Sequence, residues 1–143
     1  RWLRSHEDPS TGWWELVADA GLFLGDHPSA LPVYEQLLAL QSDAAPWLLG
    51  QAQCQLNLAG SDRDQLVDPM ATFRRLALAT SPQKLPKVYW SCQVGMLEIL
   101  QRIGTPASEL WSRVERLRSA SPELGGGWYR FQLELFQRSN RSD

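Results

Sequence analysis

Residues 87 to 103 carry apolar side chains along two faces of a helix, and this is the strongest constraint on the fold. Trp90, Val94 and Leu97 recur at i, i+4 and i+7, which is the spacing of one helical face. A second stripe runs at i, i+3, i+7, i+10 and i+14 and consists of Tyr89, Cys92, Met96, Ile99 and Ile103. A helix that is apolar on two faces has to be packed on two sides. The segment therefore predicts an inner helix held between neighbouring helices.

The segment that follows, residues 107 to 119, predicts a helix of the opposite kind. Its apolar positions form a single stripe made of Ala107, Leu110, Trp111, Val114 and Leu117. Glu109 and Arg113 stand at i and i+4 on the other side, as do Glu98 and Arg102 in the preceding helix, and such pairs stabilise exposed helical faces. Gly104 separates the two segments. Residues 87 to 119 are thus expected to form a hairpin of one buried and one half-exposed helix.

The same hairpin pattern occurs three times along the chain. Its outer helices place a small or turn residue four positions before an aromatic residue, in the pairs Ala30/Tyr34, Pro69/Phe73 and Ala107/Trp111. Inner helices are expected to start at Trp14, Trp47 and Trp90, with a fourth start at Trp128. Residues 57 to 69 lengthen the middle copy. Since no alternating apolar and polar run indicates a strand, we predict an all-α fold of about seven helices.

This pattern resembles that of the tetratricopeptide (TPR-like) helical-repeat family over residues 11 to 138. Trp14, Ala30 and Tyr34 have the spacing of the family's conserved pattern. Trp90, Ala107 and Trp111 match the same pattern with one additional residue between them. The family's Leu-Gly pair is missing, Pro69 stands where the family has Ala, and a HEAT-like array of similar period is the nearest alternative. The resemblance implies a short right-handed α-solenoid of about three helix hairpins plus a C-terminal capping helix. Residues 11–138 would then be a single repeat domain, with residues 1–10 as an N-terminal flank and residues 139–143 as a tail.

Seven tryptophans and several aromatic doublets call for a structural explanation. The doublets are Trp13-Trp14, Tyr89-Trp90 and Trp128-Tyr129, and Pro46-Trp47 is a related pair. A single helix hairpin cannot bury its apolar face alone, whereas stacked hairpins close a continuous core. Full burial of a large apolar side chain is worth roughly 2–3 kcal/mol. We therefore expect the large rings to fill the contacts between successive hairpins.

The inventory of reactive side chains argues against an enzyme. His6 and His27 are the only histidines, and neither has a neighbouring cysteine that would give metal-ligand spacing. Cys54 and Cys92 fall inside expected helices and are interpreted as small hydrophobic residues, although a bridge between them remains open. Gly125–Gly127 lacks the sequence context of a phosphate-binding loop. Glu109 and Glu115 are expected to be solvated partners of Arg113 and Arg118. We predict no catalytic residue, no cofactor and no metal.

Charge and hydropathy restrict the partners. The net charge of -2 argues against nucleic acid, which usually selects a strongly basic surface. No apolar run approaches the roughly 18 residues of a membrane span. Residues 1 to 71 hold 3 basic and 10 acidic side chains, which gives a net charge of -7. Residues 72 to 143 hold 11 basic and 6 acidic side chains, which gives a net charge of +5. This asymmetry favours a head-to-tail approach or an oriented partner, with an unevenly charged solvated surface as the simpler alternative.

Because the chain starts at Arg1, we expect it to be a piece of a longer protein whose other parts could hold an anchor, an address or an enzyme. The expected free cysteines favour the cytoplasm, and the compartment otherwise stays open.

The resemblance implies a binding function in which inner helices line a concave surface for an extended peptide or a helix. The residues that it places on this surface are Glu15, Asp19, Phe23, Leu48, Gln55, Ser91 and Glu98. This lining is small, apolar and acidic, so an apolar or basic segment fits it, and the family's clamp for a C-terminal carboxylate is not reproduced. We therefore predict a non-catalytic protein–protein interaction or scaffold module, whose partner is another protein or a segment of its own parent chain. Three alternatives stay open: a structural or regulatory appendage of an enzyme in the parent protein, a homo-oligomerisation domain, or a groove filled by residues 1–10.

Overall fold

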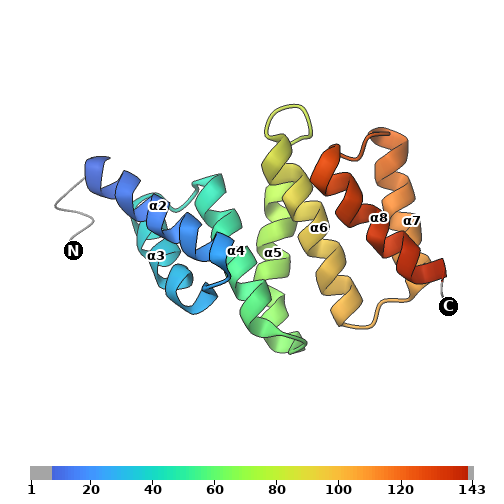
Figure 1. The fold of residues 1–143 in the computed structure, drawn as a ribbon, viewed down its shortest axis with the longest axis horizontal. Coiled ribbons are helices and arrows are strands. Elements are labelled where there is room, and N and C mark those ends of the chain that lie inside the picture. The colour runs from blue at the N-terminus through green and yellow to red at the C-terminus, as the bar shows by residue number, and fades with distance from the viewer. Residues whose placement is uncertain (1–7, 142–143) are drawn as a thin grey trace. The chain divides into compact units, whose positions relative to one another are not determined.

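The computed structural model describes residues 8 to 141, and side chains from 11 to 138. This part of the chain consists of seven helices and contains no strand (Figure 1). The helices are α2 (Asp8–Leu24), α3 (His27–Leu40), α4 (Ala45–Ala59), α5 (Arg63–Ala79), α6 (Pro86–Arg102), α7 (Ala107–Ala120) and α8 (Gly127–Arg141). The predicted all-α class and the number of helices are confirmed.

Proline and glycine set several of the helix bounds. Proline occupies the first turn of α3, α4 and α6. An N–H group in the first turn has no acceptor within the helix, so proline, which lacks this group, costs no hydrogen bond there. Gly104 has a φ of 89° just after α6, which a residue with a Cβ rarely adopts, and it ends the helix as expected. Pro32 and Pro69, by contrast, lie inside α3 and α5.

Helices extend into the segments expected at both ends of the repeat domain. The expected flank 1–10 overlaps α2, which starts at Asp8, and the expected tail 139–143 overlaps α8, which continues to Arg141. Residues 57–69, which lengthen the middle copy, consist mostly of the end of α4 and the beginning of α5. The remainder of both termini, residues 1–7 and 142–143, lies outside the described residues.

The chain divides into two compact units, one ending at Thr72 and the other starting at Phe73, which are described separately. In the N-terminal unit α3 packs against both α2 and α4, and α2 also contacts α4. The buried residues of this unit cluster around Ala18, Ala30, Tyr34, Leu37 and Cys54. Trp14 and Trp47 lie half-buried against this cluster. A helix hairpin followed by one further helix is therefore the packing arrangement of this unit.

In the C-terminal unit α7 packs mainly against α8, and α6 contacts both of these helices. Its core consists of Trp90, Leu97, Leu110, Val114, Leu124, Leu133 and Phe136. Tyr89 packs edge-on against Trp90, with ring centroids 5.1 Å apart and an interplanar angle of 87°. Such T-shaped pairs add stability beyond the apolar area that they bury. Helices α6 and α7 cover the two segments that were expected to form a hairpin over residues 87 to 119.

In both units an aromatic ring from an outer helix lies on a glycine of the next inner helix. A Cβ atom added to Gly50 would come within 3.0 Å of three ring atoms of Tyr34, and one added to Gly95 would come as close to the ring of Phe73. Tyr34 and Phe73 are both almost fully buried. The glycines are thus required for close helix packing, which offsets their low helix propensity.

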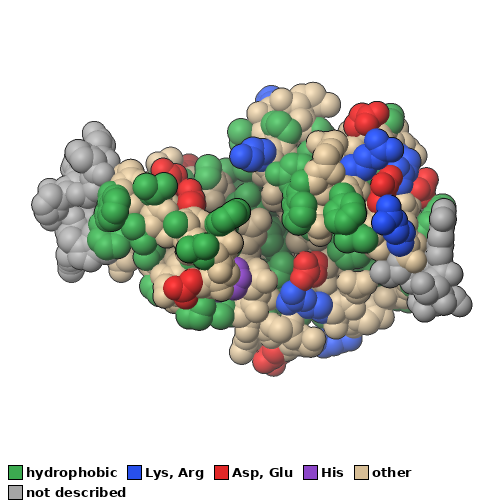
Figure 2. All heavy atoms as spheres, in the orientation of Figure 1, with side chains coloured by type: hydrophobic (Ala, Val, Ile, Leu, Met, Phe, Trp, Pro, Cys, Tyr) green, Lys and Arg blue, Asp and Glu red, His purple; other side chains and the backbone are tan. Residues whose placement is uncertain are grey.

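The expectation that the large rings fill helix contacts is correct for only part of the set. Trp90 is 2% exposed, and Trp14 and Trp47 are half-buried. Trp13 and Trp128 are 59% and 66% exposed, and Trp111 is exposed as well. Neighbouring residues of a helix point about 100° apart, so Trp14 and Tyr129 pack against core residues while Trp13 and Trp128 do not. In the Tyr89-Trp90 doublet both rings pack at the core. Figure 2 shows hydrophobic side chains at the surface over α2.

Cys54 and Cys92 are buried free thiols in α4 and α6, as predicted for small hydrophobic residues. Burial raises the pKa of Cys54 to about 11 and that of Cys92 to about 12, because the thiolate would be poorly solvated. Neither residue is therefore a reactive nucleophile.

Candidate functional site

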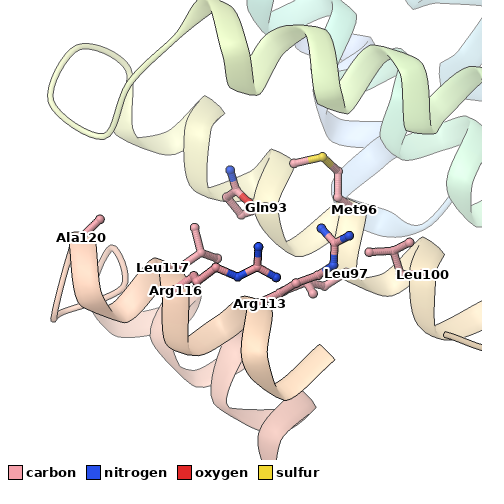
Figure 3. Close-up of a pocket in the computed structure, with 8 residues that line it drawn as sticks. All are labelled: Gln93, Met96, Leu97, Leu100, Arg113, Arg116, Leu117 and Ala120. Carbon is pink, nitrogen blue, oxygen red and sulfur yellow. The ribbon is translucent and has the colours of Figure 1, made fainter. Parts of the chain in front are cut away.

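The candidate site is a groove between α6 and α7 of the C-terminal unit (Figure 3). Four residues of each helix line it at the spacing i, i+3, i+4 and i+7, which selects one face of each helix. They are Gln93, Met96, Leu97 and Leu100 from α6, and Arg113, Arg116, Leu117 and Ala120 from α7. Leucine and methionine side chains form most of the apolar lining.

The charge of this groove comes from two arginines. Figure 3 shows the guanidinium groups of Arg113 and Arg116 pointing from α7 toward α6, over the apolar side chains. Arg113 pairs with Glu109 at 3.3 Å on the exposed side of α7, as predicted. An exposed pair of this kind contributes only about 0–1 kcal/mol, so it does not prevent Arg113 from meeting a partner's carboxylate. Arg116 is exposed.

The groove has a volume of about 210 Å³. Binding sites for small organic ligands usually measure about 300–1,000 Å³ and enclose most of the ligand. The groove between α6 and α7 is smaller and holds a few side chains. Its dimensions therefore fit the apolar side chains of a protein segment better than an entire small molecule.

Two carboxylates predicted to line a binding surface are instead engaged within the N-terminal unit. Trp47 Nε1 donates a hydrogen bond of 2.7 Å to Glu15, and the Tyr34 hydroxyl donates one of 2.6 Å to Asp19. Burial, followed by the bond to Asp19, raises the pKa of Tyr34 well above its usual value, so the hydroxyl stays protonated. These bonds tie α2 to α4 and to α3.

The other five residues that were expected to line the binding surface lie in different surroundings. Leu48 is buried, whereas Phe23 is 88% exposed. Gln55 is half-buried, and its Oε1 atom has no hydrogen-bond partner among the described residues. Ser91 donates a hydrogen bond of 3.4 Å to the Tyr129 hydroxyl, and Glu98 pairs with Arg102 as predicted. Glu98 borders a hollow of about 180 Å³ between α6 and α8.

The groove was not predicted from the sequence, in which Met96 belongs to an apolar stripe expected to be buried and Arg113 to a surface ion pair. The matching signal was the spacing i, i+3, i+4 and i+7 at residues 93 to 100 and again at residues 113 to 120. Two such faces indicate a shared groove only when the register of the helices is known, and the sequence does not give that register.

A polar network holds α8 against α7, next to the groove. Arg118 donates to Glu115 at 3.2 Å, to Glu134 at 3.1 Å and to Gln137 at 2.6 Å. Gln137 in turn donates to Glu115 at 2.7 Å. Hydrogen bonds that involve a charged group are stronger than those between neutral groups. Arg118 and Glu115 each take part in more than one of these bonds. The network fixes the side of α7 that lies against α8 and thus leaves Arg113 and Arg116 on another side.

We expect this network to make the C-terminal unit less stable in acid. The pKa values of Glu115 and Glu134 are both lowered from the ordinary value of 4.5. The main cause for Glu115 is the hydrogen bond from Gln137, and the main cause for Glu134 is the hydrogen bond from Arg118. A lowered folded-state pKa gives stability that is present above the unfolded value and is lost as pH falls through the folded value. Arg118→Met should therefore lower the urea midpoint at pH 7 and have less effect well below pH 4.5. Arg74→Met on α5 is the control, and parallel curves for Arg118→Met and the unchanged chain would contradict this prediction.

Comparison of the chain with protein-family models, with curated proteins and with solved structures finds no match. Among the described helices, none is both long and apolar enough to cross a membrane. Residues 11 to 138 contain no group of three or more His, Cys, Asp or Glu side chains that could hold a metal ion.

Proposed function

We propose that the chain is a non-catalytic protein-interaction module whose groove between α6 and α7 binds an acidic amphipathic segment, either a helix or a short peptide. The observation that supports this proposal is the combination of an apolar lining with the two arginines, Arg113 and Arg116, above it. Apolar side chains of the partner would enter between Met96, Leu100 and Leu117. Its carboxylates would lie near the guanidinium groups, which bind carboxylates through paired N–H donors.

The acidic chemistry of the proposed partner differs from the basic or apolar segment favoured on sequence grounds. That earlier expectation depended on Glu15, Asp19 and Glu98, all of which have partners within the chain. Arg113 and Arg116 instead present positive charge beside an apolar groove. Complementary charge favours an acidic segment and speeds its association.

We further propose that the helices form a TPR-like repeat array. Two features of the separate units support it: the packing of a helix hairpin on the following helix, and the aromatic ring on a glycine, Tyr34 on Gly50 and Phe73 on Gly95. Tyr34 and Phe73 are also two of the aromatic positions in the sequence pattern. Arrays of this type commonly present binding surfaces rather than catalytic sites.

A designed probe tests the proposed function. The probe is a helix-forming peptide of about 14 residues with leucines at i, i+3, i+4 and i+7 and glutamates beside them, and its binding is measured by fluorescence anisotropy. The charge-reversal variant Arg113→Glu/Arg116→Glu should weaken binding by about ten-fold or more, or about 1.4 kcal/mol, because attraction becomes repulsion. Raising the salt from about 0.05 to about 0.5 M should also weaken binding to the unchanged chain.

Matched controls separate the groove from net charge. Arg74→Glu/Arg75→Glu makes the same change in charge at exposed positions of α5, outside the groove, and should preserve most of the affinity. A second peptide carries lysine in place of glutamate and should bind weakly. Equal losses in the two double variants, or tighter binding of the lysine peptide, would refute the assignment of an acidic partner to this groove.

A further inference from the structure

The first described helix, α2, has apolar side chains on the face that points away from its own unit. Trp13, Leu16, Ala20, Phe23 and Leu24 are all exposed and lie within one side of the helix; we call this set the α2 outer face. Ala18, on the opposite side, is fully buried. A surface helix normally pairs a buried apolar face with a polar one. The outer face of α2 lacks that polar character, and Phe23 is 88% exposed.

The last helix, α8, has the same property. Trp128, Phe131 and Leu135 follow one another at i, i+3 and i+7 and are exposed; we call them the α8 outer face. Leu133, on the opposite side, is fully buried in the core. The hollow of about 180 Å³ between α6 and α8 borders this face through Leu135 and offers room for a large side chain.

Exposed apolar stripes on two helices need an explanation. Contiguous exposed apolar surface usually marks an interaction site, whereas single exposed apolar residues do not. In arrays of stacked helices the terminal repeats normally have polar outer faces, which keep the ends soluble. Here the faces of both α2 and α8 are apolar, and each begins with the exposed ring of an aromatic doublet, Trp13 or Trp128.

Charge indicates which faces fit together. Residues 1 to 72 have a net charge of -7 and residues 73 to 143 a net charge of +5. No Lys or Arg occurs in α2. Asp19 accepts a hydrogen bond from the neutral Tyr34 hydroxyl and is still exposed one turn from Leu16 and Phe23. In α8 the exposed Arg138 lies one turn from Leu135. Two α2 outer faces would bring like charges together, whereas an α2 face on an α8 face brings opposite charges together.

From these observations we infer that copies of this chain associate head to tail, with the α2 outer face of one copy against the α8 outer face of the next. Such a contact is heterologous, because the two copies contribute different surfaces, and each copy keeps one free α2 face and one free α8 face for further copies. The inference is independent of the groove between α6 and α7 and of the segment proposed to bind there.

Sedimentation of the full 143-residue chain is the first test. The average mass should rise above the 16.2 kDa of one copy as concentration increases, and it should fall again in high salt as the charges are screened. A chain that stays at the mass of one copy throughout the micromolar to millimolar range would overturn the inference.

Mixing two face variants then identifies the faces. Leu16→Ser/Phe23→Ser removes apolar side chains from the α2 outer face, and Trp128→Ser/Phe131→Ser removes them from the α8 outer face. Each double variant, studied by itself, should sediment with the mass of one copy. Their equimolar mixture should give particles of twice the mass of one copy and nothing larger, because one intact face of each kind remains. Val67→Ser/Leu78→Ser removes exposed apolar side chains from α5 and should leave association unchanged.

Other outcomes of the mixing experiment would contradict the inference. If the α8 variant still associates alone while the α2 variant does not, the contact joins two α2 faces. If the mixture remains at the mass of one copy although both variants keep their helical circular dichroism, the two faces do not meet. Should a face variant unfold, the salt and concentration dependence of the unchanged chain still decides whether the oppositely charged copies associate.

Discussion

Replacing Trp90 with alanine is expected to lower the free energy of unfolding of the C-terminal unit by about 3–5 kcal/mol. The indole is 2% exposed and lies in the core with Leu97, Val114 and Leu133. Its removal deletes the largest buried side chain of that cluster and leaves a cavity that rigid helices fill only in part. It also removes the edge-on contact with Tyr89. Urea unfolding followed by circular dichroism measures the loss.

Trp13→Ala and Trp128→Ala are the matched controls for this prediction, since both remove an indole from an exposed helical position. Each should change the free energy of unfolding by no more than about 0.5 kcal/mol, measured at a concentration where the chain is monomeric. If all three substitutions cost the same, the distinction between the packed indole of Trp90 and the exposed indoles of Trp13 and Trp128 would be wrong.

Gly50→Ala is expected to destabilise the N-terminal unit by about 1–3 kcal/mol, although alanine is the better helix former. The new methyl group would clash with the ring of Tyr34, which is buried and held by its hydrogen bond to Asp19. Gly12→Ala is the control, because a Cβ atom there meets no other atom within 4 Å. That substitution should stabilise the chain by about 0.5–1 kcal/mol.

A double-mutant cycle shows whether the ring causes the cost of Gly50→Ala. In a Tyr34→Leu background the smaller side chain leaves room for the methyl group, so the added cost of Gly50→Ala should fall by more than half. A cost that is unchanged in this background would mean that the ring does not require the glycine. The same reasoning applies to Gly95 and Phe73 in the C-terminal unit.

The helices could be predicted from the sequence because their signals are local. Apolar spacing defined the helices on either side of Gly104, and the missing alternation excluded strands. The roles of Gly50 and Gly95 could not be predicted in this way. A glycine within a helical pattern indicates only lower helix propensity, and its packing role depends on a ring 16 or 22 residues earlier in the chain.

The surfaces were harder to predict than the helices. The sequence of α2 is apolar on two sides, so periodicity did not show that Ala18 faces inward while Trp13 and Phe23 face outward. Glu15 and Asp19 were expected to meet a partner, but Trp47 and Tyr34 reach them within the unit. Contacts between residues so distant in sequence depend on the register between helices, which a single sequence does not contain.

A chemical-shift map of the isotope-labelled chain with the glutamate peptide tests the central claim most directly. The account predicts that the largest amide shifts fall on residues 93 to 100 of α6 and 113 to 120 of α7. Arg113→Glu/Arg116→Glu should raise the peptide concentration needed to produce them by about ten-fold or more. Shifts concentrated on α2 or α4, or a spectrum that the peptide does not alter at any concentration, would contradict the assignment of the binding groove.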